Sequence, residues 1–118
     1  MAKQNGPGLV RMLGNAGWCD LSDDYRGSVR RGILRDRGNT LVLDIEFAGR
    51  NYDVQLQRQG GDRFEGTWAR PKSAAVTGIA TATRYTSSEG DLLFGEWRED
   101  GKIYHWWVQL TVVDQFEN

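Results

Sequence analysis

Two side chains of this sequence stand at a spacing that could support acid–base chemistry. If Asp100-Gly101 forms the two-residue turn of a β-hairpin, Glu96 lies directly opposite His105. A carboxylate beside an imidazole can share a proton with it. No nucleophile with an orienting partner accompanies the pair, and a surface ion pair explains it more simply. The sequence therefore favours a protein that is not an enzyme and leaves that question open.

Groups that could hold a metal, a cofactor or a nucleic acid are few. The chain has one Cys, Cys19, and one His, which excludes a cysteine metal cluster, and its glycines form no phosphate-binding pattern ahead of a helix. The formal net charge is −1, from 15 basic and 16 acidic side chains. The densest local charge is a cluster of arginines that could follow a nucleic-acid backbone, at positions Arg26, Arg30, Arg31, Arg35 and Arg37. Acidic residues on the next expected strand favour cross-strand pairing instead, so neither a cofactor nor a nucleic-acid partner is expected.

The hairpin around Asp100-Gly101 also defines an apolar face that needs a core. In its register Trp97 faces Tyr104 and Gly95 faces Trp106, so the indole can lie across bare backbone. The opposite face is mixed and carries Phe94, Glu96, His105 and Trp107.

Earlier segments supply matching apolar faces. Leu41, Leu43, Ile45 and Phe47 alternate with polar residues, and a Gly49-Arg50 loop would pair Phe47 with Tyr52 and Ile45 with Val54. A three-residue Gly60-Gly61-Asp62 loop then brings Trp68 beside Val54 on the same face.

Two further strands are ambiguous. A Ser88-Glu89-Gly90 loop points Thr81, Thr83 and Tyr85 inward, whereas a loop of even length would point the alanines inward. In the segment from Ser28 to Asp36, one loop length turns Arg31 toward the core and the other turns Arg30 there. Either alternative places an arginine on the core-facing row.

Strand candidates recur about every eleven residues and are joined by short connections, which is typical of an antiparallel meander. We therefore predict a single all-β domain over residues 1–118, an antiparallel up-and-down barrel of seven to eight strands. Residues 1–17 form an irregular lead-in, residues 18–113 form the barrel, and Trp18 plugs one of its ends. The lead-in lacks an apolar run of signal-peptide length and no segment is long enough to span a bilayer, so we expect a cytoplasmic protein without a membrane partner.

The chain resembles the calycins, the up-and-down barrels that include lipocalins and avidins. Gly17-Trp18 resembles the glycine and tryptophan that open the first strand in that superfamily, and Gly27-Ser28 resembles an avidin glycine-serine pair. Residues 94–111 are similar to the penultimate avidin hairpin, in which Trp107 would hold the place of a ligand-contacting tryptophan. Because Trp107 falls on the mixed face, the resemblance implies the barrel but not the biotin-type site.

Two functions follow from these faces. Inside the barrel, aromatic rings and hydrogen-bonding groups could line a cavity for a small, partly apolar ligand; the candidates are Tyr52, Trp68, Thr81, Thr83, Tyr85, Trp97, Tyr104, Trp106 and Arg31. Alternatively the barrel is filled and acts as an interaction or accessory domain, as a homo-oligomer formed through the outer rings of Phe94 and Trp107. The N-terminal residues Leu9, Val10, Met12 and Leu13 could instead fold over those outer rings.

Overall fold

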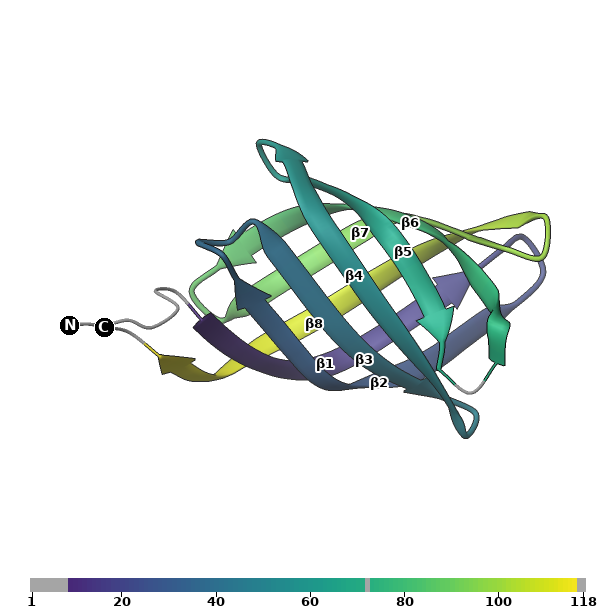
Figure 1. Cartoon of the computed structure of the whole chain (residues 1–118), viewed down its shortest axis with the longest axis horizontal. Coiled ribbons are helices and arrows are strands. Elements are labelled where there is room, and N and C mark those ends of the chain that lie inside the picture. The colour runs from purple at the N-terminus through teal and green to yellow at the C-terminus, as the bar shows by residue number, and fades with distance from the viewer. Residues whose placement is uncertain (1–8, 72, 117–118) are drawn as a thin grey trace.

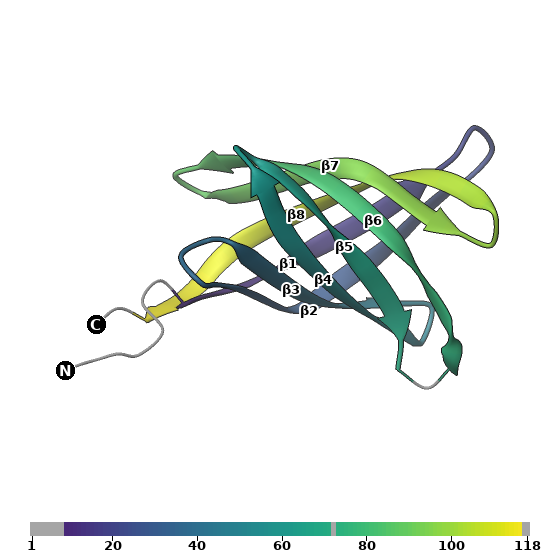
Figure 2. The same cartoon turned by 45° about the horizontal axis from the view of Figure 1, so that its top comes forward.

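The protein is a closed antiparallel β-barrel in a computed structural model that describes residues 9–71 and 73–116, with the side chains of 73–76 and 114–116 left aside. The strands follow one another around the barrel in chain order, and the first pairs with the last (Figures 1 and 2). In the described chain they are β1 Leu9–Cys19, β2 Asp24–Arg35, β3 Thr40–Phe47, β4 Arg50–Gly60, β5 Arg63–Arg70, β6 Ser73–Ser87, β7 Gly90–Glu99 and β8 Lys102–Phe116. The predicted up-and-down barrel is confirmed.

The first strand is longer than the sequence predicts. Residues 9–17 belong to β1 and not to an irregular lead-in, because they pair with β2 on one side and β8 on the other. Met12 is 1% exposed in the core, so this segment does not fold over the outer rings either. Pairing β1 with β8 removes the two open sheet edges that a seven-stranded meander would leave. Residues 1–8 lie outside the described residues.

Side chains fill the barrel along most of its length. The largest side chains with less than 2% exposure are Trp68, Trp97, Trp106, Phe64, Met12, Leu41, Leu43, Ile45, Leu56, Leu93, Leu110 and Val54. Trp106 pairs with Gly95, and its indole Nε1 donates to the Thr81 carbonyl on the strand beyond, 2.8 Å away. A Cβ on Gly95 would lie 1.8 Å from that same oxygen. The prediction that a bare backbone at Gly95 accommodates the indole is confirmed.

The hairpin between β7 and β8 has the predicted register. Trp97 pairs with Tyr104 and Glu96 with His105, and the turn residues Asp100 and Gly101 have φ values of 53° and 76°. The pairing of Trp68 with Val54 across β4 and β5 is confirmed as well.

The register of the hairpin between β3 and β4 differs from the prediction by two residues. Ile45 pairs with Tyr52, and the turn is Ala48-Gly49 with φ values of 53° and 76°. A two-residue hairpin turn of this type needs positive φ at both positions, and glycine is accommodated at the second. Because side chains alternate with period two, the inward-facing set is unchanged.

The predicted inward orientation of Thr81, Thr83 and Tyr85 is wrong. A two-residue Ser88-Glu89 turn pairs Ser87 with Gly90, which shifts the register by one residue. Ala80 and Ala82 are consequently buried, at 0% and 4% exposure, and Tyr85 is 56% exposed. The bulky indoles of the neighbouring strands occupy the interior here, so only small side chains fit beside them.

No arginine of β2 enters the core in the described structure, so the prediction for Arg31 is also wrong. The β2–β3 ladder shifts between Val29 and Arg31, and both Arg30 and Arg31 are exposed. This β-bulge lets Val29 remain buried at 3% exposure while two consecutive arginines face solvent. Arg30 forms an ion pair with Glu46 on β3, as expected for cross-strand pairing.

The two ends of the barrel carry different side chains. One end, where β1 joins β2, β3 joins β4 and β7 joins β8, is rich in aromatic rings and is called the mouth here. The other end, where β2 joins β3 and β6 joins β7, is called the closed end. There Asp91 is 5% exposed and accepts a hydrogen bond from Arg84 Nε at 2.8 Å.

Candidate functional site

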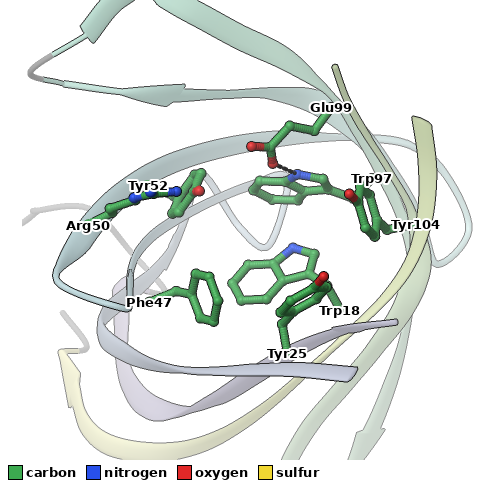
Figure 3. A pocket seen from close by; sticks show the side chains of 8 residues that line it. All are labelled: Trp18, Tyr25, Phe47, Arg50, Tyr52, Trp97, Glu99 and Tyr104. Atoms are coloured by element: carbon green, nitrogen blue, oxygen red, sulfur yellow. Dashed lines mark hydrogen bonds between the residues drawn. The ribbon is translucent and has the colours of Figure 1, made fainter. Parts of the chain in front are cut away.

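A pocket of about 220 Å³ opens at the mouth of the barrel (Figure 3). It lies where the chain turns between strands, above the filled interior. The residues that line it are Trp18, Tyr25, Phe47, Arg50, Tyr52, Trp97, Glu99 and Tyr104. In the described structure these side chains come from six strands, so closure of the barrel is what assembles the pocket. We call it the mouth pocket.

The rings of the mouth pocket stand at steep angles to one another. Tyr25 meets Phe47 at 5.7 Å and 81° and meets Tyr104 at 6.4 Å and 72°. Trp18 meets Phe47 edge-on at 5.6 Å. In Figure 3, Phe47 and Tyr52 lie on one side of the opening, and Tyr25 and Tyr104 lie on the other. Edge-to-face contacts of this kind fix the rings as walls that face in several directions.

The floor of the pocket is a rigid cluster of indoles. Trp97 stacks on Trp68 with ring centroids 4.9 Å apart and an interplanar angle of 10°, and it meets Trp106 at 5.2 Å. Each indole N–H donates a hydrogen bond: Trp68 to the Arg98 carbonyl at 3.0 Å, Trp106 to Thr81, and Trp97 to Glu99 Oε1 at 2.8 Å. These bonds hold the ring orientations, so the floor is preorganised.

Two charged side chains line the pocket. Glu99 is half-buried, and its contact with Trp97 Nε1 fixes the position of its carboxylate (Figure 3). Arg50 is exposed and lies beside Tyr52. Desolvation raises the pKa of Tyr52 above its usual value of 10.0, the charge of Glu99 acts in the same direction, and the nearby arginines oppose both. The lining therefore combines one fixed anion with one solvated cation.

Two further cations at the rim lie over tyrosine rings that line the pocket. The Arg70 guanidinium lies 5.9 Å from the centroid of the Tyr52 ring, and Lys102 Nζ lies 6.0 Å from that of Tyr104. The tyrosine rings thus already interact with positive charge in this protein.

Trp18 closes the bottom of the mouth, as its predicted role as a plug requires. It is 6% exposed and meets Trp97 at 5.4 Å and 74°. Its Nε1 is shielded from solvent and has no hydrogen-bond partner in the described structure. Figure 3 shows this nitrogen on the edge of the ring that faces Trp97.

Sequence reasoning finds the deep rings of the pocket but not its rim. Tyr52, Trp97 and Tyr104 line the pocket, and Trp68 and Trp106 lie beneath it. The other predicted ligand-contacting residues face away from it: Thr81, Thr83, Tyr85 and Arg31. Five lining residues are not among the predicted ligand-contacting residues: Trp18, which was predicted only as a plug, and Tyr25, Phe47, Arg50 and Glu99. Phe47 carried a usable signal, since it ends an inward-facing alternating row.

The predicted outer pair is adjacent on the surface. Phe94 pairs with Trp107, Phe94 is 50% exposed, and its ring meets that of Tyr85 at 5.9 Å. Trp107 is only half-exposed, because its indole covers Gly17 of β1, where a Cβ would lie 2.4 Å from Nε1. Trp107 therefore faces outward and does not contribute to the mouth pocket.

Comparison with protein-family models, with curated proteins and with solved structures finds no match to this chain. The closed antiparallel barrel is compatible with a calycin-like fold. Over the described ranges, no helix is long and apolar enough to cross a membrane. The same residues contain no group of three or more histidine, cysteine, aspartate or glutamate side chains placed to hold a metal ion.

Proposed function

We propose that this protein binds a small, partly apolar ligand in the mouth pocket, as a calycin-like binding barrel that performs no chemistry on it. The observation that carries the proposal is the cavity of about 220 Å³ among aromatic side chains at one end of an otherwise filled barrel. Pockets for drug-sized ligands usually measure roughly 300–1,000 Å³, so the ligand is smaller than that class. Rings fixed by mutual contacts offer apolar surface at low entropic cost.

The chemistry of the lining favours binding over catalysis. The pocket residues include tyrosine hydroxyls, a guanidinium and a carboxylate whose Oε1 accepts the indole proton of Trp97. A catalytic site for acyl or phosphoryl transfer requires an activated nucleophile and a base within hydrogen-bond reach of it. Glu96 and His105, the pair with acid–base potential, lie on the outer face of the barrel, away from the pocket.

The test measures ligand binding by thermal shift and by tryptophan fluorescence against a panel of small aromatic and aliphatic compounds. We expect at least one compound to raise the melting temperature and to change the fluorescence. Tyr104→Ala should abolish the shift, because this half-exposed ring is a wall of the pocket. Phe94→Ala on the outer face is the matched control and should retain it. A panel without any shift, or a shift retained in Tyr104→Ala, would count against the proposal.

Self-association through the outer face of β6–β8 is the second candidate function. It is favoured by the contact between the exposed rings of Tyr85 and Phe94, with Leu92 beside them at 42% exposure. Half of the area of such side chains amounts to roughly 300 Å², against about 800 Å² per partner in a standard stable interface. The patch is thus small for a dimer. Sedimentation of wild-type protein and Trp107→Ser distinguishes the cases: a dimer that the substitution dissociates would establish this function.

A further inference from the structure

The geometry points to a compact organic cation, such as a methylated ammonium, as the class of ligand that the mouth pocket takes. This inference rests on the proposed function and adds the sign of the ligand's charge. It draws on the angles between the rings, on the fixed carboxylate of Glu99 and on the weakness of the opposing charge.

The rings form walls around the opening. The Tyr25 ring meets that of Phe47 at 81° and that of Tyr104 at 72°, so Tyr25 stacks on neither neighbour and the three rings do not form one stack. An aromatic face carries negative electrostatic potential, and a cation enclosed by several faces interacts with each of them. A neutral flat ligand would be better served by two parallel rings. Among the described aromatic contacts, the parallel pair is Trp68 and Trp97, and these two rings already stack on each other beneath the pocket.

The carboxylate of Glu99 is the fixed charge of the lining. Its Oε1 accepts the Trp97 N–H at 2.8 Å, and Oε2 has no hydrogen-bond partner in the described residues. The side chain is half-buried, so its field is screened less than that of a fully solvated group. A cation within the pocket therefore lies close to a carboxylate that needs no reorganisation to receive it.

Arg50 opposes this charge only weakly. Its side chain is exposed, and it lies beside Tyr52 at the edge of the opening (Figure 3). Water screens the charge of a solvated guanidinium. The contacts of Arg70 with Tyr52 and of Lys102 with Tyr104 show that cations are accommodated against these rings.

A pair of probes of equal shape separates charge from size. Choline and its neutral carbon analogue 3,3-dimethyl-1-butanol are titrated into the full chain at low ionic strength and followed by calorimetry and tryptophan fluorescence. We expect choline to bind at least ten-fold tighter than the alcohol. Glu99→Gln should remove most of that difference, because the amide oxygen still accepts the Trp97 N–H while the charge is lost.

Glu96→Gln is the matched control, since it removes the same charge from the outer face of the same strand. It should leave the preference for choline unchanged. Equal affinities of the two probes for the wild-type protein, or an equal loss in both variants, would overturn the inference while leaving the mouth pocket as a binding site. Failure of both probes, together with no thermal shift from the wider panel, would overturn the proposed function itself.

Discussion

The mouth and the closed end of the barrel lie at opposite ends of the same strands and differ in the side chains that cover them. At the closed end the buried polar groups find partners: Arg84 Nε donates to Asp91 Oδ2, and the buried hydroxyl of Thr40 donates to Asp36 Oδ2 at 2.8 Å. At the mouth, aromatic rings replace such a network and leave a cavity between them. The closed end is therefore sealed by paired polar groups, whereas the mouth keeps an open pocket.

This difference separates the part of the molecule that contributes most to stability from the part at which we propose that ligand binds. Removing either partner of a buried ion pair lowers the stability of the protein, because the remaining charge is left without a partner. Rings that line a cavity already lack part of their packing, so truncating a rim ring removes less stabilisation. Substitutions at the closed end should therefore lower stability without altering binding, whereas those at the rim of the mouth should do the reverse.

The largest effect is expected for Trp97→Ala, in the floor shared by the mouth and the core. Trp97 is 1% exposed and stacks on Trp68, so its removal leaves a large cavity. The free energy of unfolding should fall by about 3–5 kcal/mol, measured by urea denaturation. Trp107→Ala is the control. That indole lies half-exposed on the outer face, so its removal should lower the free energy of unfolding by less. Equal losses would show that the floor is not tightly packed.

Asp91→Ala tests the closed end. Arg84 keeps 21% side-chain exposure, so part of its stranded charge can be hydrated, and the expected loss is about 2–3 kcal/mol. Glu65→Ala removes an ion pair of similar length, 3.0 Å to Arg63, between exposed side chains. That control should cost less than about 1 kcal/mol. The comparison between the ends would fail if both variants lost the same stability, or if Asp91→Ala altered choline binding.

Tryptophan-to-phenylalanine substitutions at two buried positions compare a satisfied N–H with an unsatisfied one. Trp106→Phe leaves the Thr81 carbonyl without its indole donor, whereas Trp18→Phe removes a nitrogen that has no hydrogen-bond partner. Both remove similar volume, so Trp106→Phe should be the more destabilising by about 1–2 kcal/mol. Chemical denaturation of the two variants measures this difference. Equal losses would mean that the N–H of Trp18 contributes as much as a hydrogen bond.

The sequence predicted those parts of the fold that a single turn determines. Asp100-Gly101 supplies the positive φ values of a two-residue turn, and the register of β7 and β8 followed from it. For β3 and β4 the apolar row was predicted correctly, but not the register, because Ala48 adopts a φ of 53° that is uncommon for alanine. The bulge before Arg31 has no signature in the alternation of side chains, so the orientation of that residue could not be read from the sequence.

The rim of the mouth pocket could not be predicted for a different reason. Tyr25, Phe47 and Glu99 meet there because the strands are tilted and the barrel is closed, and neither property is encoded in one segment of the chain. The deep rings of Trp97 and Tyr104 could be predicted, since one hairpin register places both on the apolar face.

The smallest effect concerns the pH dependence contributed by Tyr52. Its folded pKa lies above the usual 10.0, chiefly through desolvation, so the unfolded chain releases this proton first as the pH rises. The stabilising contribution is complete below the unfolded pKa and is lost as the pH rises through the folded pKa. Tyr52→Phe should therefore lose less stability than the wild type between about pH 9 and about pH 11, measured by urea unfolding. Val54→Ala on the same strand destabilises the barrel but keeps the hydroxyl, and it should retain the wild-type slope. An unchanged slope in Tyr52→Phe would mean that water reaches this hydroxyl, so that the mouth is more open than its rings suggest and differs still further from the closed end.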